Sequence, residues 1–179
     1  MRNVKNLLLA AGLGLALAGL AVAASTGSQT VGMQVGSICV LAVTGNPSTL
    51  TVAAPATGGA APTNPSSNAT YAQYTSTVAA SQSRRLTAAW GSSDAAPSGC
   101  SLKLTAAPSG HTNEGASAGQ ITLSSTAQDI VSTIKSCATG QGPTSGTQLT
   151  YQLSVDSLTA LVASESKTAT VTLTLTDAA

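Results

Sequence analysis

The last stretch of the chain, residues 168–176, alternates strictly between two kinds of side chain. Threonines occupy the even positions, and the odd positions between them hold Ala169, Val171, Leu173 and Leu175. A period of two residues is the pattern of a β-strand with one buried face and one solvated face. Threonine is β-branched, so the polar positions also favour a sheet over a helix. The stretch therefore predicts a strand that belongs to a sheet of its own domain.

Weaker forms of this pattern recur along the chain, separated by turns rich in glycine, proline, asparagine and serine. Besides the last stretch, strands are predicted at residues 30–44, 50–54, 71–78, 84–90, 100–106, 121–123 and 149–155. About eight strands separated by turns favour an all-β fold with antiparallel sheets packed as a β-sandwich. Residues 25–179 are long enough for a single domain of this kind.

The segment from Ala127 to Ile134 fits two structures. Ala127, Ile130, Val131 and Ile134 follow helical spacing, and Asp129 lies near the start, where a helix favours negative charge. The same residues also fit a bent strand. The sequence leaves both alternatives open.

The first predicted strand, residues 30–44, is apolar on both faces in its second half. Its odd positions are apolar apart from Ser37: Val31, Met33, Val35, Cys39, Leu41 and Val43. Its even positions become apolar from residue 38 onward: Ile38, Val40 and Ala42. A strand with two apolar faces is typical of a segment that is buried from both sides.

Residues 1–24 have the features of a secretory signal peptide. Arg2 and Lys5 give a positive start, residues 7–22 form an apolar stretch, and residues 21–23 are a small-x-small cleavage site. The apolar stretch is short for a membrane span, and no basic stop-transfer cluster follows it. We therefore expect a chain that is secreted across the inner membrane to the cell surface or the medium. Contact with the membrane is expected only through this segment before cleavage.

Charged residues make up only 7% of the chain. Without Arg2 and Lys5, five basic and six acidic side chains remain, so no basic stripe is left to bind nucleic acid. The basic pair Arg84-Arg85 is interpreted as a solvated strand edge. An almost uncharged surface rich in serine and threonine fits a subunit that packs against copies of itself.

Three cysteines are present, and secretion would place them in an oxidising compartment where a pair closes. We expect the pair to be Cys100 and Cys137, because Cys100 opens an inward-facing strand and Cys137 precedes a long one. Such a bridge would close a loop of about 36 residues and stabilise the fold by about 3–4 kcal/mol. Cys39 is left over, either as a small buried apolar side chain or as an intermolecular bridge.

The sequence holds few groups that could carry catalysis. His111 is the only imidazole, the carboxylates are scattered singly, and no Gly-x-Ser-x-Gly nucleophile elbow occurs. His111 and Glu114 alone do not provide the clustered ligands that a metal ion needs. We therefore expect no enzymatic activity, no cofactor and no metal site.

Aromatic residues number three tyrosines and one tryptophan. Trp90 is interpreted as a core anchor between two sheets. The alternative is a ligand-stacking surface formed by Trp90, Tyr71 and Tyr74. A surface of that kind would make the chain an adhesin-like or carbohydrate-binding module.

Taken together, these features resemble secreted bacterial fimbrial and filament subunits of the immunoglobulin-like kind. The resemblance rests on the signal segment, the aromatic-poor body, the alternating stretch at residues 31–43, the expected cysteine pair and the threonine-faced last strand. It implies an immunoglobulin-like β-sandwich and a terminal strand that completes a sheet of the next subunit.

The resemblance also implies a donor strand and a function. Residues 25–44 would be the donor, with six candidate assembly residues: Val31, Met33, Val35, Cys39, Leu41 and Val43. The implied function is structural, as a subunit of an extracellular or cell-surface filament. Its partners would be copies of itself or other surface subunits.

Overall fold

The structure of this chain is a computed structural model, which describes residues 26–178. The chain divides into two units, Met1–Gln34 and Val35–Ala179. In the first unit, residues 26–34 form neither strand nor helix, and their side chains are exposed. The signal segment predicted at residues 1–24 lies outside the described residues.

The second unit consists of strands joined by turns and loops. A 3-10 turn at Leu158–Ala160 (η1) is the only helical element between residues 26 and 178. The strands are β1 (Ile38–Thr44), β2 (Ser66–Thr77), β3 (Arg84–Trp90), β4 (Cys100–Ala107), β5 (Ala116–Ser117), β6 (Gln120–Thr122), β7 (Gln128–Ile134), β8 (Cys137–Ala138), β9 (Thr147–Val155) and β10 (Val171–Asp177).

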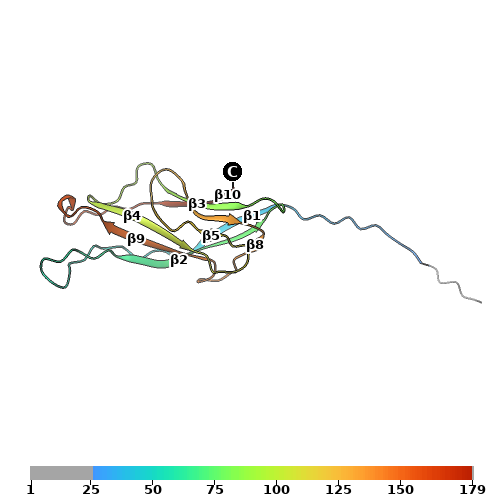
Figure 1. The fold of residues 1–179 in the computed structure, drawn as a ribbon, viewed down its shortest axis with the longest axis horizontal. Coiled ribbons are helices and arrows are strands. Elements are labelled where there is room, and N and C mark those ends of the chain that lie inside the picture. The colour runs from blue at the N-terminus through green and yellow to red at the C-terminus, as the bar shows by residue number, and fades with distance from the viewer. Residues whose placement is uncertain (1–25, 179) are drawn as a thin grey trace, which may run out of the picture. The chain divides into compact units, whose positions relative to one another are not determined.

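These strands form two antiparallel sheets. The six-stranded sheet has the order β1-β2-β9-β4-β6, with β8 also paired to β2, and the four-stranded sheet has the order β10-β3-β7-β5. Figure 1 shows β3 and β10 in one layer and β2, β9 and β4 in the other. The predicted all-β fold with two packed antiparallel sheets is confirmed.

Alternate side chains of both sheets meet in one core. On β9, for example, Leu149 and Tyr151 are buried, whereas Gln148, Thr150 and Gln152 remain partly exposed. The core cluster consists of Ala72, Tyr74, Leu86, Ala88, Leu104, Ala106, Leu123, Ile130, Val131, Ile134, Leu149 and Tyr151. Burying one large apolar side chain contributes about 1.5–3 kcal/mol, so this cluster is what holds the two sheets together.

The last strand keeps the alternation that predicted it. Leu173 and Leu175 of β10 pack against the core, and Thr172 and Thr174 are exposed. The strand begins at Val171, however, so residues 168–170 are not part of it. The strands predicted at residues 84–90 and 100–106 correspond to β3 and β4.

Two predictions of local structure were wrong. The strand predicted at residues 30–44 begins only at Ile38, and residues 50–54 contribute only the isolated bridge Ala53↔Thr63. Of the two alternatives left open for residues 127–134, the structure shows the strand, because Gln128–Ile134 is β7. Two register shifts against β3 and a positive φ of 56° at Thr133 disturb the period of two. Ile130, Val131 and Ile134 can therefore all face inward and imitate helical spacing.

Candidate assembly site

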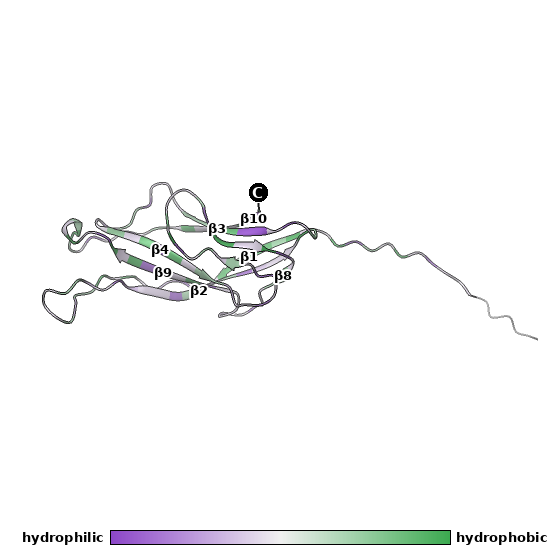
Figure 2. Ribbon diagram, viewed as in Figure 1, coloured by the Kyte–Doolittle hydropathy of each residue, from purple (hydrophilic) through white to green (hydrophobic). Residues whose placement is uncertain are grey.

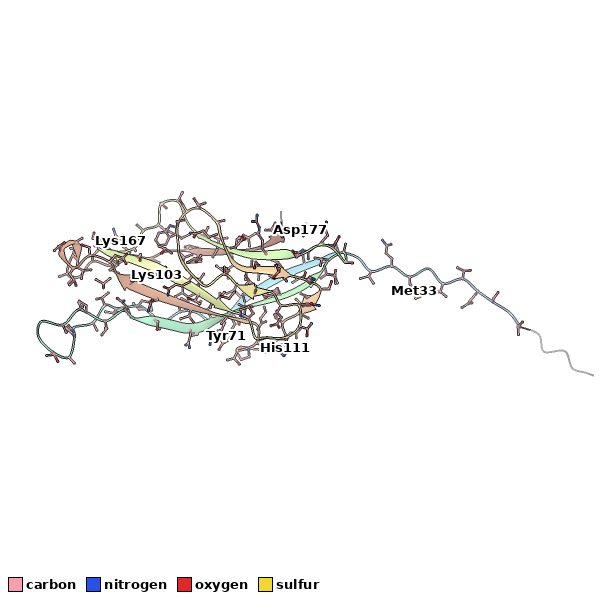
Figure 3. The ribbon with its side chains drawn as sticks, in the orientation of Figure 1. Met33, Tyr71, Lys103, His111, Lys167 and Asp177 are labelled. Carbon is pink, nitrogen blue, oxygen red and sulfur yellow. The ribbon has the colours of Figure 1, made fainter. Side chains whose placement is uncertain are left out.

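Exposed large apolar side chains are concentrated near the start of the described chain. Eight large hydrophobic residues in the described part are exposed, and six of them lie between positions 31 and 43. These six are Val31, Met33, Val35, Ile38, Val40 and Val43. Met33, labelled in Figure 3, is the most exposed at 90%. Single exposed apolar residues are ordinary, whereas six of them within one short segment are an unusual concentration.

Strand β1 is an unprotected edge of the six-stranded sheet. It pairs with β2 in continuous register from Ile38↔Thr77 to Thr44↔Tyr71, and its other side has no strand partner among the described residues. The strand contains no charge, proline or bulge, which are the usual means of protecting an edge. Figure 2 shows its apolar character in green. This edge can therefore accept a further strand.

The expectation that both faces of the first strand are buried was wrong. Ile38 and Val40 lie on the outer face of β1, and Val40 is 58% exposed. On the inner face Leu41 packs against the core, but Val43 remains 50% exposed. Cys39 is exposed as well, so it is not the small buried residue that one reading of the sequence predicted. An edge strand has a neighbour on one side only, and this position leaves much of its apolar surface uncovered.

Strand β10 is the edge of the other sheet and lies next to β1. The two edges are close at Cys39, whose Sγ lies 3.6 Å from the carbonyl oxygen of Leu175. Further along, Val43 and Val171 line a cavity of about 270 Å³ between the two edges. The apolar interior of this cavity includes Leu50, Leu102 and Tyr151. This cavity lies between the end of β1 and the start of β10, and we call it the β1–β10 cleft.

A second hollow, of about 890 Å³, adjoins the first. It shares Leu50 and Leu102 with the β1–β10 cleft, and Trp90 and Leu153 also line it. Residues 161–169 lie along its border. The hollow therefore extends the apolar interior of the cleft toward the loop that precedes β10.

The loop at this second hollow is fastened by Glu165. Its carboxylate accepts a hydrogen bond from the backbone N–H of Ser98 at 2.8 Å, and the Nζ of Lys167 lies 3.4 Å from its other oxygen. The hydrogen bonds from Ser98, followed by the charge of Lys167, hold the pKa of Glu165 below its usual value. Glu165 is therefore ionised at neutral pH and ties the loop to the start of β4.

The aromatic residues considered for ligand stacking do not lie on a common face. Tyr74 is buried, and its hydroxyl donates a hydrogen bond to the backbone oxygen of Glu114 at 2.6 Å. Tyr71 lies on the opposite face of β2, where its hydroxyl accepts a hydrogen bond from Nε2 of Gln148 at 3.0 Å. Trp90 packs against the core from β3. Trp90 is only partly buried there, and the three rings do not share one exposed face.

The predicted disulfide partners are also far apart. Cys100 pairs across the sheet with Val155, the last residue of β9, whereas Cys137 pairs with Ser76 beyond the other end of β9. The whole nine-residue strand separates the two levels, which is on the order of 25 Å at about 3.3 Å per residue. A disulfide needs Cα atoms within about 7 Å. Cys39, Cys100 and Cys137 are all free thiols in this fold, and burial raises the pKa of Cys100 and Cys137.

His111 belongs to a small polar cluster in the loop between β4 and β5 (Figure 3). Its Nδ1 lies 2.7 Å from the Ser109 hydroxyl and 3.3 Å from the buried Glu114 carboxylate, and Ser109 also donates to Glu114. In a catalytic triad the serine and the carboxylate contact different nitrogens of the ring. Here both contact Nδ1, so the cluster cannot pass a proton from Ser109 through the ring to Glu114. It serves to fasten the loop.

Sequence reasoning missed one residue of this region, Arg84. It was expected at a solvated edge, but it is only 5% exposed and contacts both β1 and β10. A signal was present in the sequence, because Arg84 has the same parity as Leu86 and Ala88, which face the core. Arg85, its neighbour, is the half-exposed residue of the pair and lies 3.5 Å from Asp129.

Comparisons with known proteins identify no relative: no family model, curated protein or solved structure matches this chain. Between residues 26 and 178, no helix is long and apolar enough to cross a membrane. The same part of the chain contains no group of three or more side chains that could hold a metal ion.

Proposed function

We propose that this protein is a structural subunit of an extracellular or cell-surface filament, and that its copies associate by strand addition. The observation that carries the proposal is the run of exposed apolar side chains at residues 31–43, a segment without a single charge. Covering one such side chain stabilises by about 1.5–3 kcal/mol. Association that covers several of them at once therefore gains free energy from each, which works against the entropic cost of bringing two chains together.

The chain offers both halves of such a contact. Val31, Met33 and Val35 occupy alternate positions, so an extended backbone presents them on one side. The edge strands β1 and β10 offer main-chain donors and acceptors, and the β1–β10 cleft, where the two strands meet at Val43 and Val171, has an apolar lining. Main-chain hydrogen bonds would supply affinity, and the alternate apolar side chains would supply register.

The proposal includes secretion through the segment at residues 1–24 and an immunoglobulin-like arrangement of the sandwich. The two packed antiparallel sheets support the second point. The scarcity of charge supports the whole proposal, since a nearly neutral surface favours association with other copies.

The test uses purified chain that begins at residue 25, studied by sedimentation and negative-stain electron microscopy. We expect polymers, and we expect the triple variant Val31→Ser, Met33→Ser, Val35→Ser to remain monomeric and folded. The matched control changes the opposite parity, Thr30→Ser, Gly32→Ser and Gln34→Ser, and should assemble like the parent. A parent chain that is monomeric at every concentration, or two variants that assemble equally, would contradict the proposal.

A second candidate function, an adhesin-like binding module, is favoured by one observation. Trp90 lines the hollow of about 890 Å³ and remains partly exposed there. Trp90 is the only tryptophan, so its fluorescence reports directly on this hollow. A saturable spectral shift on titration with a set of mono- and disaccharides would support this function, and no shift with any of them would argue against it.

A further inference from the structure

Arg84 joins the first and the last strand of the second unit. Its Nε donates to the Asp177 carboxylate at 2.9 Å, at the end of β10 (Figure 3). Its two terminal nitrogens donate to the backbone oxygen of Ile38 and to the Ser37 hydroxyl, the latter at 2.9 Å. A buried guanidinium requires such partners, because an unpaired buried charge is strongly unfavourable. The start of β1 therefore supplies two of the three groups that satisfy Arg84.

Thr77 also holds the start of β1 in place. Its hydroxyl accepts a hydrogen bond from the backbone N–H of Ile38 at 2.7 Å and donates one to the backbone oxygen of Gly36 at 2.9 Å. Thr77 is also the residue directly opposite Ile38 in the β1–β2 pairing. Residues 36–38 are thus held by two side chains that come from different sheets.

We propose that Arg84 and Thr77 clamp the start of β1, so that β1 stays in its own sheet and only the residues before Gly36 are donated to a neighbouring copy. This inference rests on the proposed strand addition and assigns the donor segment within it. If β1 left its sheet, Arg84 would keep only Asp177 as a partner, and the Thr77 hydroxyl would lose both of its bonds.

The clamp divides the six candidate assembly residues into two groups with different roles. Val31, Met33 and Val35 precede the clamp and form the donated side. The other three follow the clamp and remain in the receiving copy, where they form the inner face of its β1: Cys39, Leu41 and Val43. The donor predicted at residues 25–44 is therefore shortened to residues that end before Gly36.

The test asks whether β1 and β2 of one sheet belong to the same chain in the polymer. Val40 and Thr75 lie directly opposite each other and are both exposed. Their expected Cα separation of about 4.5–5.5 Å suits a disulfide. Val40→Cys and Thr75→Cys are introduced into a chain with Cys39→Ala, Cys100→Ala and Cys137→Ala. The assembled protein is oxidised, denatured and run on a non-reducing gel.

We expect the disulfide to form within single chains, because β1 remains paired with β2 of its own chain. Arg84→Gln should raise the fraction of interchain disulfides several-fold, and Arg85→Gln, the control at the neighbouring exposed arginine, should not. If Arg84→Gln does not fold, Thr77→Val applies the same test with a side chain of similar shape. Predominantly interchain disulfides with the clamp intact, or equal effects of Arg84→Gln and Arg85→Gln, would overturn the inference.

Hydrogen exchange separates the clamp from assembly. In dissociated chains, the amides of β1 should exchange several-fold faster in Arg84→Gln and Thr77→Val than in Arg85→Gln. Equal exchange in all three variants would refute the clamp. A chain that never assembles would refute the proposed function, and the exchange rates would still decide whether the clamp exists.

Discussion

The hydroxyl of Tyr74 donates a hydrogen bond of 2.6 Å to the backbone oxygen of Glu114, and both residues are buried. The bond ties the C-terminal half of β2 to the loop between β4 and β5. The same loop is fastened by the contacts of Ser109 and His111 with the Glu114 carboxylate. Tyr74 and Glu114 together therefore close one end of the core.

Tyr74→Phe should lower the free energy of unfolding by about 1–2 kcal/mol. The change leaves the oxygen of Glu114 without this donor and removes the contact of 3.1 Å with the Thr147 hydroxyl. Urea unfolding followed by circular dichroism measures the difference. Tyr71→Phe is the matched control, because Tyr71 is only partly buried and should change stability by less than about 0.5 kcal/mol. Equal effects of the two changes would contradict the role given to Tyr74.

The free energy of unfolding should also fall at high pH because the Tyr74 phenol ionises more readily in the unfolded chain. Burial raises the pKa of Tyr74 from its ordinary value of 10.0 to about 12. Between these values the unfolded chain releases the phenolic proton and the folded chain retains it, so unfolding becomes easier as pH rises. We expect a loss of about 1–2 kcal/mol from pH 10 toward pH 12. Urea midpoints across this range measure it.

Tyr74→Phe should flatten that pH dependence without abolishing it. Tyr151 has a raised pKa for the same reason, burial, and it contributes in the same direction. An unchanged slope in Tyr74→Phe would show that Tyr74 does not titrate in this way.

The parts of the fold that were predictable from sequence are those set by local alternation. In β10, Leu173 and Thr174 face opposite sides because neighbouring residues of any strand do so. The same holds for Leu104 and Thr105 in β4. Such patterns can be predicted without knowing which strand is the neighbour in the sheet.

The positions of Arg84 and of the cysteines could not be predicted in this way, because they depend on the order of the strands in the sheets. Arg84 can be buried because its charge is compensated by Asp177, which is 93 positions later in the chain and lies directly opposite it. Cys100 and Cys137 are kept apart because the whole length of β9 runs between their levels. Local spacing carries no information on such distant pairings. For this reason the sequence predicted a solvated Arg84 and a disulfide between Cys100 and Cys137.

The end of β1 depends on Gly45. Its φ of 74° is in the left-handed region, and a Cβ at this position would lie 1.9 Å from the backbone oxygen of Ala69. Gly45→Ala should therefore lower the free energy of unfolding by more than about 1 kcal/mol. Gly58→Ala, where a Cβ meets nothing within 4 Å, is the control and should be neutral. Chemical denaturation compares the two, and similar midpoints would count against this turn geometry.

The ion pair between Arg84 and Asp177 should contribute more to the free energy of unfolding than the ion pair between Arg85 and Asp129. Asp177→Asn leaves the buried guanidinium with only neutral partners, and we expect a loss of about 2–3 kcal/mol. The value stays below that of a fully buried pair because the Asp177 side chain is 72% exposed. Asp129→Asn breaks a pair whose two side chains are 38% and 42% exposed, and it should change stability by less than about 1 kcal/mol.

A double-mutant cycle separates the ion pair from the rest of the clamp. Arg84→Gln should destabilise more than Asp177→Asn, because it also removes the donors to Ser37 and Ile38. Once Arg84→Gln is present, Asp177→Asn should add little, since the charge that Asp177 compensates is gone. Urea unfolding of the four proteins gives the coupling. Additive effects would mean that Asp177 acts independently of Arg84, and the end of β10 would then have no part in holding β1.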